Sequence, residues 1–137
     1  MVPAFFGLRS AVRDKNMPIN TDVILRRFEQ PDETREMVLG RFEIIRIGGM
    51  TIGRATYQPG WRWSEHVGRA LGKERCDVEH LGLVISGEAT AEFADGRVVP
   101  LRAGQLFYIP PDPHDSRVVG SEPYVSLHFI GADKYAK

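Results

Sequence analysis

The feature that most constrains the fold of this chain is a series of short apolar segments, separated by turn residues at intervals of about ten residues. The segments are rich in β-branched or aromatic residues, and no stretch between them shows a clear amphipathic helical period. This pattern predicts an all-β fold, and a double-sheet jelly-roll barrel is the form that suits a single small domain. The nine predicted strands are residues 22–28, 41–47, 50–57, 80–86, 89–93, 97–101, 105–109, 116–119 and 124–130.

Glycine, proline and aspartate mark the turns between these segments. Asp95-Gly96 is a hairpin signal, because both central positions of a tight hairpin turn take a positive φ that Asp and Gly tolerate. Pro100 lies inside a predicted strand and has no N–H group, so that strand is expected at a sheet edge or at a bulge. Residues 31–39 are expected to form a loop, with a helical turn as the alternative.

The chain of 137 residues has the length of one domain and can bury a core without disulfides or a structural metal. The strand pattern begins shortly after Met17, which is also an alternative start of translation. We therefore expect residues 1–18 to form a flexible N-terminal extension, and residues 19–137 to form a single β-barrel domain.

Charge and hydropathy exclude several classes of partner. Eighteen basic and eighteen acidic residues cancel, so no broad positive field attracts nucleic acid or an anionic membrane surface. No stretch reaches the roughly 20 apolar residues that cross a bilayer, and the N-terminus lacks the pattern of a signal peptide. A single cysteine cannot form an internal disulfide, which favours a cytoplasmic location.

Residues 59–87 hold two of the four histidines and the single cysteine. Side chains alternate across a strand, so Cys76 and His80 share a face if the strand that contains His80 extends back without a bulge. His66 lies at the far end of the preceding segment, and His114 follows several prolines in a stiff turn. Together His66, Cys76, His80 and His114 form a set that is typical of a divalent transition-metal site.

Three segments resemble the two sequence motifs of the cupin superfamily. Gly60 to His66 (GWRWSEH) and His80 to Gly87 (HLGLVISG) are similar to the first motif, and Gly104 to His114 (GQLFYIPPDPH) is similar to the second. The signatures PGWRWSEHV, Cys-x-x-x-His and IPP…HD look like those of a subgroup of small, single-domain bacterial cupins. The resemblance spans roughly residues 41–130 and implies a double-stranded β-helix, the jelly-roll barrel of cupins, with a metal at its centre.

Transferred position by position, the resemblance implies His66, His80 and His114 as metal ligands. Gly68 replaces the second histidine of the first motif, and His80 stands where that motif has glutamate. The second motif lacks its glycine, and its histidine comes one residue early. The parity of the strand supplies Cys76 as the remaining ligand.

A thiolate ligand affects both the choice of metal and the chemistry of the site. Sulfur beside imidazoles favours zinc, with iron, manganese, nickel or copper as alternatives. Three histidines and one cysteine fill a tetrahedral zinc ion and leave no open position for substrate or water. Such a site is catalytic only if the metal expands to five ligands or if one of the four residues is not a ligand.

Four further polar residues are candidates for lining the pocket or for supporting the ligands. Arg62 shares the parity of His66, and it either reaches an anion in the pocket or lies exposed. Asp115 either orients an imidazole or caps a turn. Glu79 is expected to face away from the metal unless a bulge intervenes. His128 either lines the pocket or lies exposed on the last strand.

Trp61 and Trp63 have the parity opposite to that of His66. They are expected to face away from the metal, at a subunit interface or between layers.

Two functions of different classes fit these features. The first is a metal-dependent oxygenase, isomerase or lyase that acts on a small organic molecule, with Glu79 or His128 as its general acid or base. The second is a non-catalytic barrel that binds or senses a small ligand and whose metal stabilises the fold. A homodimer is expected in either case, because a second copy commonly covers exposed edge strands.

Overall fold

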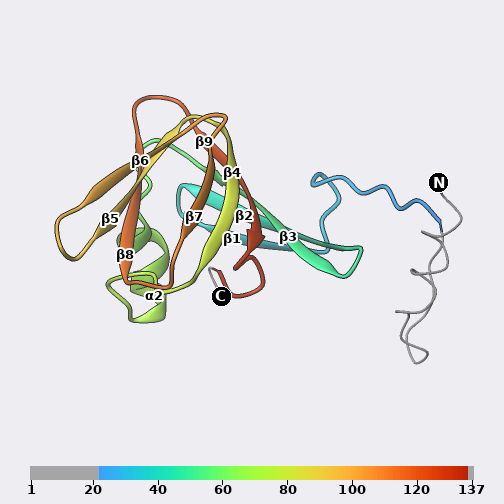
Figure 1. The fold of residues 1–137 in the computed structure, drawn as a ribbon, viewed down its shortest axis with the longest axis horizontal. Coiled ribbons are helices and arrows are strands. Elements are labelled where there is room, and N and C mark those ends of the chain that lie inside the picture. The colour runs from blue at the N-terminus through green and yellow to red at the C-terminus, as the bar shows by residue number, and fades with distance from the viewer. Residues whose placement is uncertain (1–21, 136–137) are drawn as a thin grey trace, which may run out of the picture.

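A computed structural model describes residues 22–135 and shows nine strands in two antiparallel sheets that enclose one core (Figure 1). The larger sheet has the strand order β1-β2-β3-β9-β4-β7, and the smaller sheet has the order β6-β5-β8. The predicted all-β jelly-roll is confirmed. The flexible extension predicted for residues 1–18 lies outside the described residues.

Most of the strands coincide with the predicted segments to within two residues. The strands are β1 (Glu33–Met37), β2 (Gly40–Ile47), β3 (Met50–Tyr57), β4 (His80–Ser86), β5 (Glu88–Phe93), β6 (Val98–Arg102), β7 (Leu106–Ile109), β8 (His114–Val119) and β9 (Tyr124–Ile130). A one-turn π-helix, η1 (Ser64–Gly68), runs into the short helix α2 (Arg69–Leu71) between β3 and β4. This helical turn was not predicted, and it moves the side chains around it off strand parity.

The strand predicted at residues 22–28 is wrong, and β1 (Glu33–Met37) forms the sheet edge instead. β1 was predicted as part of a loop. Its pairing is set by a two-residue hairpin, in which Met37 pairs with Gly40 and Leu39 takes a positive φ of 62°. Because a two-residue turn fixes strand register, this hairpin aligns β1 against β2.

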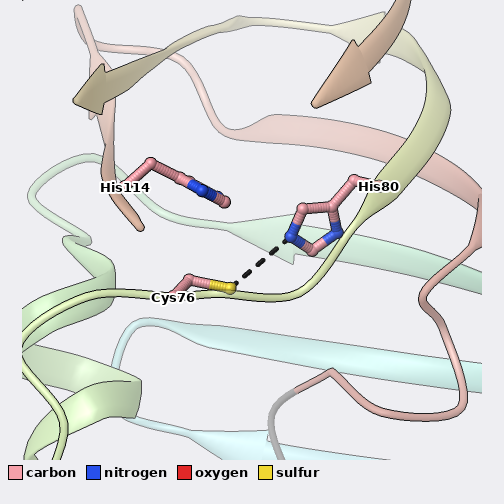
Figure 2. Close-up of side chains that lie close together, drawn as sticks. All are labelled: Cys76, His80 and His114. Carbon is pink, nitrogen blue, oxygen red and sulfur yellow. Dashed lines mark hydrogen bonds between the residues drawn. The ribbon is translucent and has the colours of Figure 1, made fainter. Parts of the chain in front are cut away.

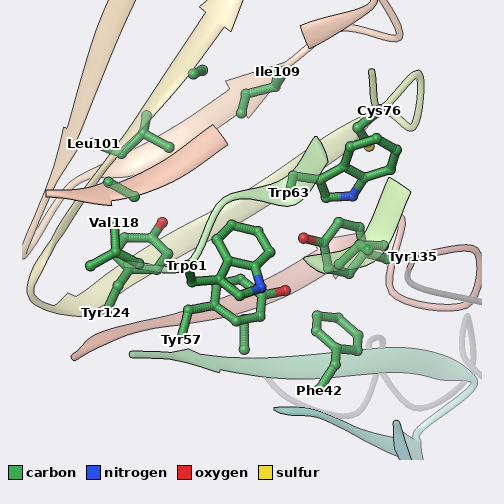
Figure 3. Packing of buried hydrophobic residues seen from close by; sticks show 14 of the residues in the cluster. Phe42, Tyr57, Trp61, Trp63, Cys76, Leu101, Ile109, Val118, Tyr124 and Tyr135 are labelled. Carbon is green, nitrogen blue, oxygen red and sulfur yellow. The ribbon is translucent and has the colours of Figure 1, made fainter. Parts of the chain in front are cut away.

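The inner faces of both sheets meet in a core that is rich in aromatic residues (Figure 3). Trp61 stacks face to face on Tyr57, with ring centroids 3.8 Å apart. Trp61 and Trp63 are both buried, so the interpretation that they pack between layers is confirmed. Both lie in the turn just before η1, where strand parity does not apply.

β6 and β7 are edge strands of the smaller and the larger sheet. Pro100 lies on β6, an edge of the smaller sheet, as its missing N–H group requires. β7 is an edge of the larger sheet, and its Leu106 and Tyr108 side chains are exposed. A second copy of the chain covering such an edge stays a prediction. Within residues 22–135, no helix is long and apolar enough to cross a membrane.

Candidate metal centre

A pair of backbone hydrogen bonds places Cys76 directly opposite His114. The N–H of Cys76 donates to the His114 carbonyl at 2.8 Å, and the N–H of His114 donates to the Cys76 carbonyl at 2.9 Å. The two residues form an isolated antiparallel bridge. Residues paired in this way project their side chains to the same face of the sheet. The segment before β4 is thereby attached to the start of β8.

His80 opens β4 and turns its ring toward the same point (Figure 2). Its Nε2 lies 3.5 Å from Sγ of Cys76. Ligand atoms of Cys76, His80 and His114 all lie within 4.8 Å of one another, and all three residues are buried. Among residues 22–135, this is the one group of three or more such residues that could hold a metal.

Burial keeps these side chains in their neutral forms. It lowers the pKa of His80 to about 2 and also lowers the pKa of His114. It raises the pKa of the Cys76 thiol to about 11. Nδ1 of His114 lies 2.9 Å from the Asp112 carbonyl oxygen, which only accepts, so Nδ1 carries the proton and Nε2 is left free.

The donor set fits a divalent transition metal. Zinc binds sulfur at about 2.3 Å and imidazole nitrogen at about 2.0–2.1 Å, so two donors on one tetrahedral ion lie about 3.3–3.8 Å apart. The observed separation of 3.5 Å between Cys76 and His80 falls in this range. The Nδ1 atom of His80 is buried without a hydrogen-bond partner, and a metal on Nε2 would leave it so.

The structure does not bring His66 into this group. His66 lies on η1, half-buried, and its Nδ1 accepts a hydrogen bond of 2.9 Å from the backbone N–H of Arg62. This local bond follows from the helical turn, which was not apparent in the sequence. Ligation by His66 stays a prediction.

Asp115 connects the turn before η1 to β8 through hydrogen bonds of its side chain. Its carboxylate accepts hydrogen bonds from Arg62, from the backbone N–H and hydroxyl of Ser64, and from the backbone N–H of Ser116. Arg62 also lies 3.6 Å from Glu92. The guanidinium of Arg62 is therefore occupied by acidic partners on β5 and β8, and Asp115 holds the backbone next to His114.

Glu79 faces away from the cluster. Its carboxylate accepts a hydrogen bond of 2.5 Å from the Tyr108 hydroxyl. It lines a surface pocket together with Asp77 and Asp133. A role for Glu79 as general acid or base stays a prediction.

His128 lies inside the barrel, in the middle of β9. It pairs with Gly53 on one side and with Gly82 on the other. A Cβ at Gly53 would meet the Phe42 ring at 2.3 Å, and one at Gly82 would meet the Phe107 ring at 2.5 Å. Both rings instead pack edge-on against the His128 imidazole, at centroid distances of 5.4 and 5.6 Å. The two glycines therefore make room for this buried histidine.

A cavity of about 40 Å³ adjoins the cluster. Its lining comes from both sheets, from the turn before η1 and from the C-terminal turn: Tyr57, Trp63, His80, Leu101, Phe107, Ile109, His114, Ser116, Tyr124, His128 and Tyr135. Four aromatic residues in this list were not among the candidate site residues: Tyr57, Trp63, Tyr124 and Tyr135. Tyr57 lies on β3, so the alternation of side chains along that strand could have predicted that it faces the interior. Trp63 was predicted to face away from the metal. It lines the cavity because its backbone leads into η1, where strand alternation does not apply.

Family and structure comparisons agree with this architecture. The model of the cupin domain matches residues 53–130, which are 78 of the 137 residues. The chain belongs to the cupin family. A search of curated proteins found no match for this cupin.

Several solved structures share the fold. A variant of oxalate decarboxylase from Bacillus subtilis is 23% identical, with a TM-score of 0.57, and the match covers 94% of this cupin and 35% of that chain. A second structure of that enzyme, described by its Mn(II) centres, is 21% identical with a TM-score of 0.53 and the same coverage. A protein of unknown function from Acidithiobacillus ferrooxidans is 18% identical with a TM-score of 0.53, over 72% of this cupin and 86% of that chain.

At these identities the likeness shows the fold alone. This cupin spans about a third of the oxalate decarboxylase chain.

Proposed function

We propose that this cupin binds a divalent transition metal through Cys76, His80 and His114. The observation that carries the proposal is the convergence of three buried donor atoms within 4.8 Å. The donors come from three places: the segment before β4, the first residue of β4 and the first residue of β8. One thiol and two imidazoles are ligands that zinc and related divalent metals take in proteins.

Zinc is the preferred ion in this proposal. Thiolate and imidazole together favour zinc over manganese, which prefers carboxylate and carbonyl oxygen. The Mn(II) centres of Bacillus subtilis oxalate decarboxylase support a metal in this kind of barrel, though not its identity here. Iron, nickel and copper are the alternatives that a metal analysis would separate.

An enzymatic role is the second candidate function, favoured by the cavity beside the cluster. Three protein ligands leave a fourth position of a tetrahedral ion open, as in catalytic zinc sites. A bound zinc ion supplies Lewis acidity there. Around it, His80 and His114 line a cavity from which the packed aromatic rings exclude bulk water. The non-catalytic alternative is a site that only stabilises or senses.

The test is a zinc titration of the metal-free full-length chain, with Cys76→Ser as the main variant. We expect one zinc ion per chain in the wild type and an affinity lowered by at least tenfold in the variant. His66→Gln is the matched control, because His66 lies outside the group of three. It should retain the wild-type affinity.

Two results would contradict the proposal. One is the absence of stoichiometric zinc binding by the wild type. The other is a loss of binding in His66→Gln that equals the loss in Cys76→Ser, which would restore His66 as a ligand in place of the described group.

A further inference from the structure

We propose that the cavity beside the Cys76, His80 and His114 cluster is a binding site for a small monoanion, which receives hydrogen bonds from the Trp63 indole N–H and the Tyr57 hydroxyl. The inference rests on the proposed metal site. It deepens that proposal by naming the class of ligand that the site accepts. Three features of the cavity carry it: its polar atoms, its size and its charge.

The first feature is a set of buried polar atoms without partners. Trp63 Nε1, Tyr57 Oη and Nδ1 of both His80 and His128 are buried and make no hydrogen bond. All four residues line the cavity, and each is less than a tenth exposed. A buried donor without a partner costs free energy, so their gathering at one cavity indicates a ligand or ordered water that satisfies them.

Two of these groups are suited to an acceptor. An indole N–H is a donor only, and Figure 3 shows the Trp63 nitrogen on the ring edge that faces Tyr135, another residue that lines the cavity. Burial raises the pKa of both Tyr57 and Tyr135, and the interaction between their hydroxyls lowers the pKa of Tyr57 and raises that of Tyr135, as expected if Tyr135 is the donor and Tyr57 the acceptor. Tyr57 has no partner for its own O–H group. The Tyr57 proton therefore remains available to a ligand.

The second feature is size. The cavity of about 40 Å³ is about three times the roughly 10–15 Å³ that one water-sized sphere needs. Pockets for drug-sized ligands measure about 300–1,000 Å³. The interior therefore admits a ligand of about three non-hydrogen atoms and excludes most organic substrates.

The third feature is charge. A divalent metal and the Cys76 thiolate sum to one positive charge, and the imidazole ligands add none. The cavity lining within residues 22–135 contains no Asp, Glu, Lys or Arg side chain. An unbalanced buried charge is costly, so one negative charge from a ligand neutralises the site. A monoanion satisfies the charge and the two donors together.

The test uses the full chain loaded with cobalt(II), whose visible absorption reports its ligands, and azide as the probe. We expect azide to shift the spectrum of the wild type and the larger benzoate ion to leave it unchanged. Trp63→Phe should weaken azide binding by about tenfold, which corresponds to about 1.4 kcal/mol. Tyr57→Phe should weaken it similarly and provides a second variant if the first does not fold.

Trp61→Phe is the matched control. The Trp61 indole nitrogen is also buried without a partner, but Trp61 does not line the cavity. Its removal should change azide affinity by less than about twofold. Equal losses in the Trp61 and Trp63 variants would overturn donation by Trp63.

The outcomes also separate this inference from the metal proposal. If cobalt binds with one ion per chain and azide leaves the spectrum unchanged, the monoanion site is refuted and the metal site stands. If no cobalt binds, the metal proposal fails, and the monoanion site fails with it.

Discussion

Replacement of Asp115 by alanine should destabilise the barrel strongly, although Asp115 is not a proposed ligand. Its Oδ1 accepts the backbone N–H groups of Ser64 at 3.0 Å and Ser116 at 2.9 Å. Its Oδ2 accepts Arg62 Nη1 at 3.0 Å and the Ser64 hydroxyl at 2.8 Å. The carboxylate thus holds the turn before η1 against β8, and alanine removes all four hydrogen bonds.

The size of the effect follows from burial. The Asp115 side chain is 12% exposed, whereas that of Arg62 is 31% exposed and keeps Glu92 at 3.6 Å. Breaking a fully buried ion pair costs about 3–5 kcal/mol. Because solvent and Glu92 partly compensate Arg62, we expect the lower end, about 3 kcal/mol, for Asp115→Ala.

Asp115→Asn is the control, since its amide oxygen can replace Oδ1 and keep both backbone hydrogen bonds. It should lose about half as much, roughly 1–2 kcal/mol. Urea unfolding followed by tryptophan fluorescence measures both variants. At an m-value of about 2 kcal/mol/M, the alanine variant should unfold about 1.5 M earlier than the wild type. A shift below about 0.25 M, or equal shifts in both variants, would refute this account of Asp115.

Three further predictions concern pH, metal and packing. Burial lowers the pKa of His80 to about 2 and of His128 to about 4, below the unfolded value of about 6.5, so the unfolded state binds more protons. Stability of the metal-free protein should therefore fall as the pH drops from about 6.5 toward 4, by up to about 1.4 kcal/mol per pH unit for each histidine, and a flat series of urea midpoints would contradict this. Zinc at a thousandfold excess over its Kd should stabilise the fold by about 4 kcal/mol, seen in calorimetry as a higher Tm that a chelator reverses. Gly82→Ala would place a Cβ 2.2 Å from the Leu127 carbonyl oxygen and 2.5 Å from the Phe107 ring. This overpacking should lower the free energy of unfolding by about 3 kcal/mol. An unchanged urea midpoint would contradict this, because it would show that the neighbouring atoms move aside.

Local patterning predicted most of the strands, because a strand with one buried face alternates apolar and polar side chains along its sequence. β3, β4 and β9 show this most clearly, since their predicted bounds equal the observed ones. The pattern failed at Glu33–Met37, whose residues are half-buried or exposed. An edge strand of this kind has no run of buried apolar residues that would identify it in the sequence. Its position in the sheet is set by its hairpin with β2.

The alternation of side chains along a strand predicted that Cys76 and His80 lie on the same face of one strand. The structure brings the two side chains together in a different way. β4 begins only at His80, so Cys76 lies outside the strand. It is held by its bridge to His114. That pairing joins segments far apart in the sequence, and nothing in either segment alone specifies it.

The sequence by itself determined the all-β barrel, its turns and the residue types of a metal site, because these are written in local alternation and in short motifs. The tertiary structure decided which residues meet. It separated His66 from the cluster by folding its segment into η1, and it turned His128 and Trp63 toward one small cavity. Contacts between distant segments depend on how two sheets pack, and that packing has no local signature in the chain.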